Sequence, residues 1–256
     1  MLLYGVHKDA ATLRKMLDPA SFAGIVISDD AAVYGNFSAS QKCWAHLLRK
    51  AIKLTLQDPD NAEYRVFTDR LLEIYREACR VQLDKRLSDE GRGRKVSALE
   101  DELLDLCWPM WVAELPPLEG LANDYRLLIN EVVRLLLGDQ LLTFVTARPT
   151  EQPNGTTKPV DGTNNEAERT LRGAAQARLT GRTNKTLHGA RRQTILTSVL
   201  ESLRLYLPTF TLSSVLDELK RWWEIGRSCF AELVESLGYI PPKNSVVDQL
   251  LPGPSG

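Results

Sequence analysis

Apolar residues at helical spacing run almost without interruption from residue 43 to residue 138, and this block restricts the chain to a largely helical architecture. Four successive helices are predicted within the block. The third is expected to end at Pro109, because proline removes a backbone N–H, and the fourth at Gly138. Each helix carries an apolar face that needs a partner, so we expect the helices to pack as a bundle.

Two short apolar runs precede this block. Residues 1–6 and 24–28 fit buried strands, and residues 11–17 between them have helical spacing. A strand, a helix and a strand in this order imply a parallel pair in an α/β sheet, with functional groups at the carboxyl ends of the strands. Asp29 and Asp30 directly follow the second run.

After the block, residues 148–162 are rich in Pro, Gly and Thr and fit a solvated loop. Asn164 or Asn165 can cap a helix that continues to Arg178. Two further helices are predicted, one ending before Pro208 and one that contains Trp222. The chain thus combines a short α/β segment with many helices.

Overall charge gives no argument for a nucleic acid or a membrane as partner, because 32 basic residues nearly balance 33 acidic ones. No run approaches the roughly 18 apolar residues of a membrane span. The cysteines are scattered without a CxxC pair, which argues against a disulfide framework and a structural zinc site. We expect a cytoplasmic protein.

Two acidic residues are candidates for metal chemistry. Asp29 ends an apolar strand, where a carboxylate reaches solvent, although such a residue is often only a turn or helix cap. Glu168 lies in the first turn of a predicted helix, where the helix dipole alone favours acidic residues. Asp30 and Glu166 are the competing neighbours.

A basic stripe follows Glu168. Between residues 169 and 192 no acidic residue occurs, and the seven basic ones are Arg169, Arg172, Arg178, Arg182, Lys185, Arg191 and Arg192. Threonines, an asparagine and glycines lie among them and suit the approach of a phosphate backbone. The stripe predicts DNA binding, and a solvated helix face is the plainer alternative.

Cys43 and His46 form a Cys-x-x-His at the start of the helical block. As zinc ligands they lack a second pair. A structural pair at a strand-to-helix junction is therefore the preferred interpretation.

These segments together resemble bacterial DDE transposases with a ribonuclease H-like core, specifically the family numbered sixty-six among insertion sequences. The resemblance is carried by Gly24-Ile-Val-Ile-Ser-Asp29 with Tyr34, Cys43-Trp-Ala-His46, Thr163-Asn-Asn-Glu-Ala-Glu-Arg-Thr-Leu-Arg172 and Gly189-Ala-Arg191. It implies a partial core in residues 1–42, a helical insertion in 43–147, a loop in 148–162, the C-terminal part of the core in 163–240 and a flexible tail in 241–256.

The resemblance also implies roles for single residues. Asp29 becomes the second catalytic acid and Glu168 the third, both binding Mg²⁺ or Mn²⁺, while Asn164 and Asn165 belong to the structural motif with Cys43. The implied activity is metal-dependent cleavage and transfer of DNA strands during transposition, with two metal ions activating the attacking group. Hard oxygen ligands favour these ions.

The first catalytic Asp of the family is expected upstream of the strand at residues 1–6, so this chain is predicted to lack it. We therefore expect a truncated or split transposase, or a decayed remnant, that binds metal weakly at best and is inactive alone. The alternative is a non-catalytic DNA-binding or regulatory protein. Expected partners are the DNA ends of the element, with intact transposase or accessory transposition proteins, in association with the nucleoid.

Overall fold

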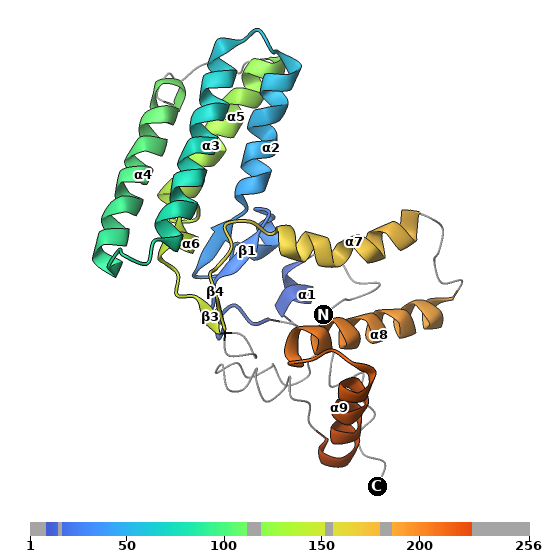
Figure 1. Cartoon of the computed structure of the whole chain (residues 1–256). Coiled ribbons are helices and arrows are strands. Elements are labelled where there is room, and N and C mark those ends of the chain that lie inside the picture. Colours follow the sequence, from blue (N-terminus) through green and yellow to red (C-terminus); the bar gives the residue numbers. More distant parts are fainter. Residues whose placement is uncertain (1–8, 15–16, 112–118, 152–155, 180–185, 227–256) are drawn as a thin grey trace.

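Four long helices dominate the computed structural model, which describes residues 9–14, 17–111, 119–151, 156–179 and 186–226. They pack side by side as a bundle (Figure 1). Their bounds are Trp44–Gln57 for α2, Ala62–Leu83 for α3, Asp89–Trp111 for α4 and Gly120–Leu137 for α5. The largely helical character predicted for this part of the sequence is therefore confirmed.

The core of the bundle is formed by the apolar row of each helix. Fully buried side chains come from all four helices and include Leu47, Leu71, Leu103 and Ile129. Burying a leucine or isoleucine side chain stabilises a fold by about 1.5–3 kcal/mol. The bundle therefore provides a rigid platform, to which the strand ends described below are attached.

Pro109 does not end its helix, and this prediction was wrong. Helix α4 continues through Pro109 to Trp111. Proline lacks the N–H that would bond the carbonyl of Asp105, but this loss falls in the last turn of the helix. Leu103 and Cys107, both fully buried, hold that end of α4 in the core and oppose early fraying.

The strand predicted at residues 24–28 is found as β1 (Val26–Ser28), preceded by the short helix α1 (Ala10–Arg14). Its partner in the described residues is β2 (Ser40–Lys42), which runs parallel to β1 after the 3-10 helix Ala32–Tyr34. The pairing predicted with residues 1–6 lies outside the described residues.

Strand β2 is polar in sequence and nevertheless fully buried. The Gln41 side chain explains this, because its amide donates to the carbonyls of Lys42 and Leu141 and its oxygen accepts from the N–H of Phe144. A buried polar group is tolerated when its hydrogen bonds are made. Gln41 thus joins β2 to the segment after the bundle, where the short helix α6 (Thr143–Thr146) lies.

The segment expected as a loop, residues 148–162, contains a small antiparallel pair formed by β3 (Thr150–Glu151) and β4 (Thr157–Lys158). Three helices follow and extend to one side of the bundle (Figure 1). They are α7 (Asn165–Leu179), α8 (Leu187–Tyr206) and α9 (Leu212–Ile225). Among the described residues, no helix has the length and apolarity needed to cross a membrane.

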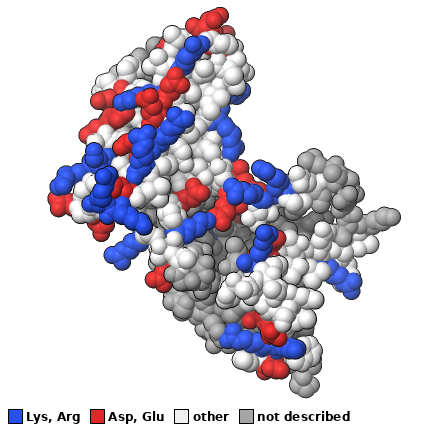
Figure 2. All heavy atoms as spheres, viewed as in Figure 1, with Lys and Arg blue, Asp and Glu red and all other residues white. Residues whose placement is uncertain are grey.

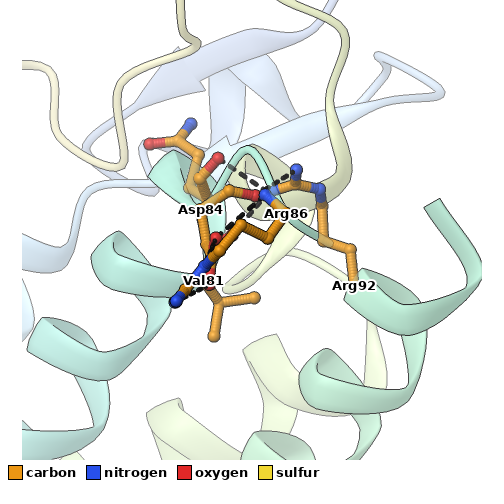
Figure 3. Close-up of polar contacts among 5 residues, drawn as sticks. Val81, Asp84, Arg86 and Arg92 are labelled. Carbon is orange, nitrogen blue, oxygen red and sulfur yellow. Dashed lines mark hydrogen bonds and ion pairs between the residues drawn. The ribbon is translucent and has the colours of Figure 1, made fainter. Parts of the chain in front are cut away.

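The corner between α3 and α4 is held by an arginine (Figure 3). The guanidinium of Arg92 donates to the carbonyls of Val81, Gln82 and Asp84, with 2.6 Å between its NH1 and the Gln82 oxygen. These carbonyls belong to the end of α3, where helical hydrogen bonds are missing. Arg86 instead pairs with the Asp84 carboxylate at the surface, and this pairing lowers the pKa of Asp84 to about 2.

We expect Arg92→Ala to lower the free energy of unfolding by about 1.5–3 kcal/mol, because three carbonyls lose a charged donor. Arg86→Ala is the matched control from the same corner and should leave stability almost unchanged, since its side chain is 90% exposed. Urea unfolding followed by circular dichroism measures both. Equal effects of the two substitutions would contradict the capping role of Arg92.

Candidate catalytic and DNA-contact site

Asp29 lies one residue beyond β1 and is exposed. Its Oδ1 accepts a hydrogen bond from the N–H of Ala31 at 3.3 Å, which fixes the turn that leaves the strand. The strand end itself is anchored, because the carbonyl of Ser28 accepts from the N–H of Cys43 at 2.9 Å. A carboxylate at the solvent side of a fixed strand end suits the binding of a cation.

Cys43 connects this strand end to the start of α7. Its side chain is buried, and its Sγ accepts from the N–H of Asn164 at 3.3 Å, 121 residues away in sequence. The N–H of Trp44 bonds the carbonyl of Gly162 at 3.1 Å. Figure 1 shows the start of α7 beside β1. The segments that carry Asp29 and Glu168 therefore meet at Cys43.

Glu168 lies one turn into α7, where its N–H bonds the carbonyl of Asn164. Its carboxylate is held by two residues of α2: His46 Nε2 is 3.4 Å from Oε1, and Arg49 NH2 is 3.4 Å from Oε2. The neighbouring Glu166 pairs with Lys158 of β4 instead. The two acidic residues of this turn thus have different surroundings, and only Glu168 contacts the bundle through these pairs.

Two buried atoms beside this carboxylate have no hydrogen-bond partner in the described part of the chain, His46 Nδ1 and Asn164 Oδ1. Unsatisfied buried polar atoms are rare and each costs about 1–3 kcal/mol. Both belong to residues that the sequence motif singles out. Hydrophobic packing alone does not account for these two buried polar atoms at the junction of α2 and α7.

The partners of Asp30 lie on β2 and α5. Its carboxylate pairs with Lys42 of β2, at 3.6 Å, and with Arg134 of α5. Asp30 is thus engaged by two cations and is less exposed than Asp29.

The basic stripe is described only in part. Arg169 and Arg172 on α7 and Arg191 and Arg192 on α8 are exposed. The Arg178 side chain, Arg182 and Lys185 lie outside what the structure describes. Figure 2 shows Lys and Arg side chains along the inner corner between the bundle and α7.

Carboxylate oxygens are the ligands that Mg²⁺ and Mn²⁺ prefer. Asp29 and Glu168 supply such oxygens, but nowhere in the described ranges do three or more His, Cys, Asp or Glu side chains gather as a metal site would require. Glu168 is now balanced by Arg49 and His46, which a cation would have to displace. The fit to a metal is therefore limited to two oxygen donors.

Sequence reasoning missed the partners of Glu168 and of Asp30. Arg49 lies three residues after His46 and therefore on the same face of α2, a spacing that could have indicated a shared contact. Lys42 and Arg134 offered no such signal, because one lies in an unpredicted strand and the other 104 residues from Asp30.

Comparison with known families supports the resemblance carried by the sequence motifs. A family model described as "Transposase IS66 family" matches residues 2–136, more than half of the chain. The match includes Asp29, Cys43, His46 and the bundle, and it ends before Glu168. No curated protein and no solved structure gives a significant match. The chain belongs to the IS66 family of transposases.

Proposed function

We propose that this chain takes part in DNA transposition through metal-dependent cleavage and transfer of strands, with Asp29 as the second catalytic acid and Glu168 as the third. The main observation behind this proposal is the junction at Cys43. The Cys43 N–H donates to the carbonyl of Ser28, and its Sγ accepts from the N–H of Asn164. These contacts between segments far apart in sequence support the proposed convergence of the two carboxylates. A ribonuclease H-like core around β1 is part of this proposal.

Transposases of the DDE type use divalent metal ions. In such enzymes the bound metal activates water or a 3′-hydroxyl and stabilises the leaving oxygen at phosphorus. Asp29 and Glu168 would hold it here. The chain's own contribution is orientation: Cys43 fixes both segments, and His46 and Arg49 hold the Glu168 carboxylate toward α2. Positioned ligands matter because small displacements of a reacting group cost large factors in rate.

The proposed DNA contacts are the basic residues that follow Glu168 in the sequence up to residue 192. They are Arg169, Arg172, Arg178, Arg182, Lys185, Arg191 and Arg192. Among the described ones, the exposed guanidinium groups of Arg169 and Arg172 on α7 and of Arg191 and Arg192 on α8 would hold the phosphate backbone.

Arg172→Ala is expected to weaken binding to a DNA duplex several-fold and to reduce the slope of log affinity against log salt by about one unit. Fluorescence anisotropy with labelled DNA between about 50 and 200 mM salt measures the effect. Arg94→Ala is the control, since Arg94 is also exposed but lies on α4 and pairs with Glu90. A DNA affinity that does not change with salt concentration, or no binding at low salt, would contradict the proposed DNA contact.

The engagement of Glu168 by Arg49 and His46 favours a second candidate, a non-catalytic DNA-binding or regulatory protein. A nicking assay on supercoiled plasmid with Mg²⁺ or Mn²⁺ separates the two. DNA binding together with metal-dependent nicking supports catalysis, whereas binding without nicking in either metal supports the regulatory role. The absence of the first acid and inactivity of the chain alone stay predictions.

A further inference from the structure

Helix α2 carries basic residues on the surface of the bundle. Its Lys and Arg residues are Arg49, Lys50 and Lys53, and the helix contains no acidic residue. Residues three or four positions apart share one face of a helix, so these cations lie together on one side of α2. Each of the three side chains is more than half exposed. We call these three residues the basic face of α2.

The formation of α2 does not explain this basic face. Arg49 and Lys53 are four residues apart, and like charges at this spacing repel each other and destabilise a helix. The core contacts of α2 are made by other residues, among them the buried Leu47 and Leu54. Neither helix formation nor core packing therefore calls for cations at these positions.

Each cation of the basic face is paired with an acidic residue of another helix. The pairs are Arg49 with Glu168 of α7, Lys50 with Glu131 of α5 and Lys53 with Asp124 of α5. Ion pairs with such exposed cations contribute little to stability, because water and salt screen them. A phosphate backbone can therefore take the place of the acids at low cost.

The basic face meets the basic stripe at Glu168. Arg49 NH2 is 3.4 Å from Glu168 Oε2, and Arg172 lies one turn after Glu168 on the same side of α7. Arg172 and Arg169 are both exposed. The basic face of α2 thus extends the surface that we propose for DNA onto the bundle.

We propose that the basic face of α2 is a second DNA-contact surface, which holds the phosphate backbone of the same duplex that the arginines of α7 contact. This inference rests on the proposed DNA binding of the chain. Arg49 and Lys53 are about 6 Å apart along the helix axis, a length over which one DNA strand carries about two phosphates. The phosphates replace the acids as partners of the cations, and the release of counterions from the DNA favours this exchange.

Lys50→Gln/Lys53→Gln tests the contact without changing Arg49 or Glu168. The double variant is expected to bind a fluorescein-labelled duplex of arbitrary sequence about tenfold more weakly, with a slope of log affinity against log salt reduced by about two units. Fluorescence anisotropy measures both quantities. The matched control is Arg70→Gln/Arg80→Gln, which removes two positive charges from α3 that also pair with acids. It should leave the affinity nearly unchanged.

Removal of the acids is expected to have the opposite effect. Asp124→Asn/Glu131→Gln takes away the acidic partners of Lys53 and Lys50 on α5 and should strengthen DNA binding several-fold, because the phosphates no longer compete with them. If the two ion pairs were only structural, this variant would bind no more tightly than the unchanged chain. Circular dichroism checks that each variant stays folded.

Two results would overturn the inference and leave the proposed DNA binding intact. If Arg172→Ala weakens binding but Lys50→Gln/Lys53→Gln does not, the basic face of α2 does not contact the DNA. If the double variants of α2 and α3 weaken binding equally, only net charge matters. Absence of duplex binding by the unchanged chain at low salt would instead remove the proposed DNA binding and this inference together.

Discussion

Glu168→Gln is expected to weaken Mn²⁺ binding by at least about tenfold, because it replaces a charged oxygen ligand with a neutral amide of the same shape. Asp29→Asn should have an effect of similar size, since the proposed site holds the ion between these two carboxylates. Isothermal titration with Mn²⁺ at millimolar concentrations, or its paramagnetic resonance signal, measures the change. Both substitutions keep the side-chain volume and should leave the fold intact.

Glu166→Gln is the matched control for this prediction. Glu166 lies on the same turn of α7, two residues earlier, and pairs with Lys158 rather than with α2. Its substitution should leave Mn²⁺ affinity unchanged. If Glu166→Gln and Glu168→Gln had equal effects, binding would reflect the general negative charge of the turn, and the assignment of Glu168 as the third acid would fail.

Trp44→Ala is expected to lower the free energy of unfolding by about 3–5 kcal/mol, a large share of the 5–15 kcal/mol typical of a folded domain. The Trp44 side chain is 0% exposed, stacks on Tyr75 with 5.2 Å between ring centroids, and donates from Nε1 to the carbonyl of Leu141 at 2.7 Å. Its loss leaves a cavity and removes one of the two hydrogen bonds that the Leu141 carbonyl accepts, the other coming from Gln41.

The result is measured by thermal unfolding, with Trp108→Ala as the control. Trp108 is 49% exposed on α4 and should tolerate truncation with a much smaller loss. Trp44 also directly follows Cys43, and its own N–H bonds Gly162. We therefore expect Trp44→Ala to loosen the junction of α2 and α7 as well. Equal losses from the two tryptophans would contradict the central place of Trp44 in the core.

The helices could be predicted because their signal is local. An apolar residue every three or four positions indicates a buried face, whatever lies against it. Strand β2 had no such signal: Ser40, Gln41 and Lys42 are polar, and they are buried because their polar groups find partners in distant segments. The prediction that α4 ends at Pro109 was wrong for a related reason. Packing of the buried Cys107 outweighed the local tendency of proline to end a helix.

The candidate site divides in the same way. Asp29 and Glu168 were named from the sequence, through a strand end, a helix start and the family motifs, and their roles stay proposals. What surrounds them was not predictable. His46 and Arg49 reach Glu168 from α2, and Arg49 is 119 residues from it in sequence. No pattern in one segment specifies which distant segment will pack against it.

By itself, the sequence determined where helices form, which residues could carry negative charge to a metal, and to which family the chain is related. Only the tertiary structure decided that Cys43 joins the strand end to α7 and that Asp30 pairs with Lys42 and Arg134. The physical reason is the distance in sequence over which each kind of interaction acts. Helical periodicity depends on residues within two turns, whereas pairing of a buried charge depends on which chain segments the fold brings together.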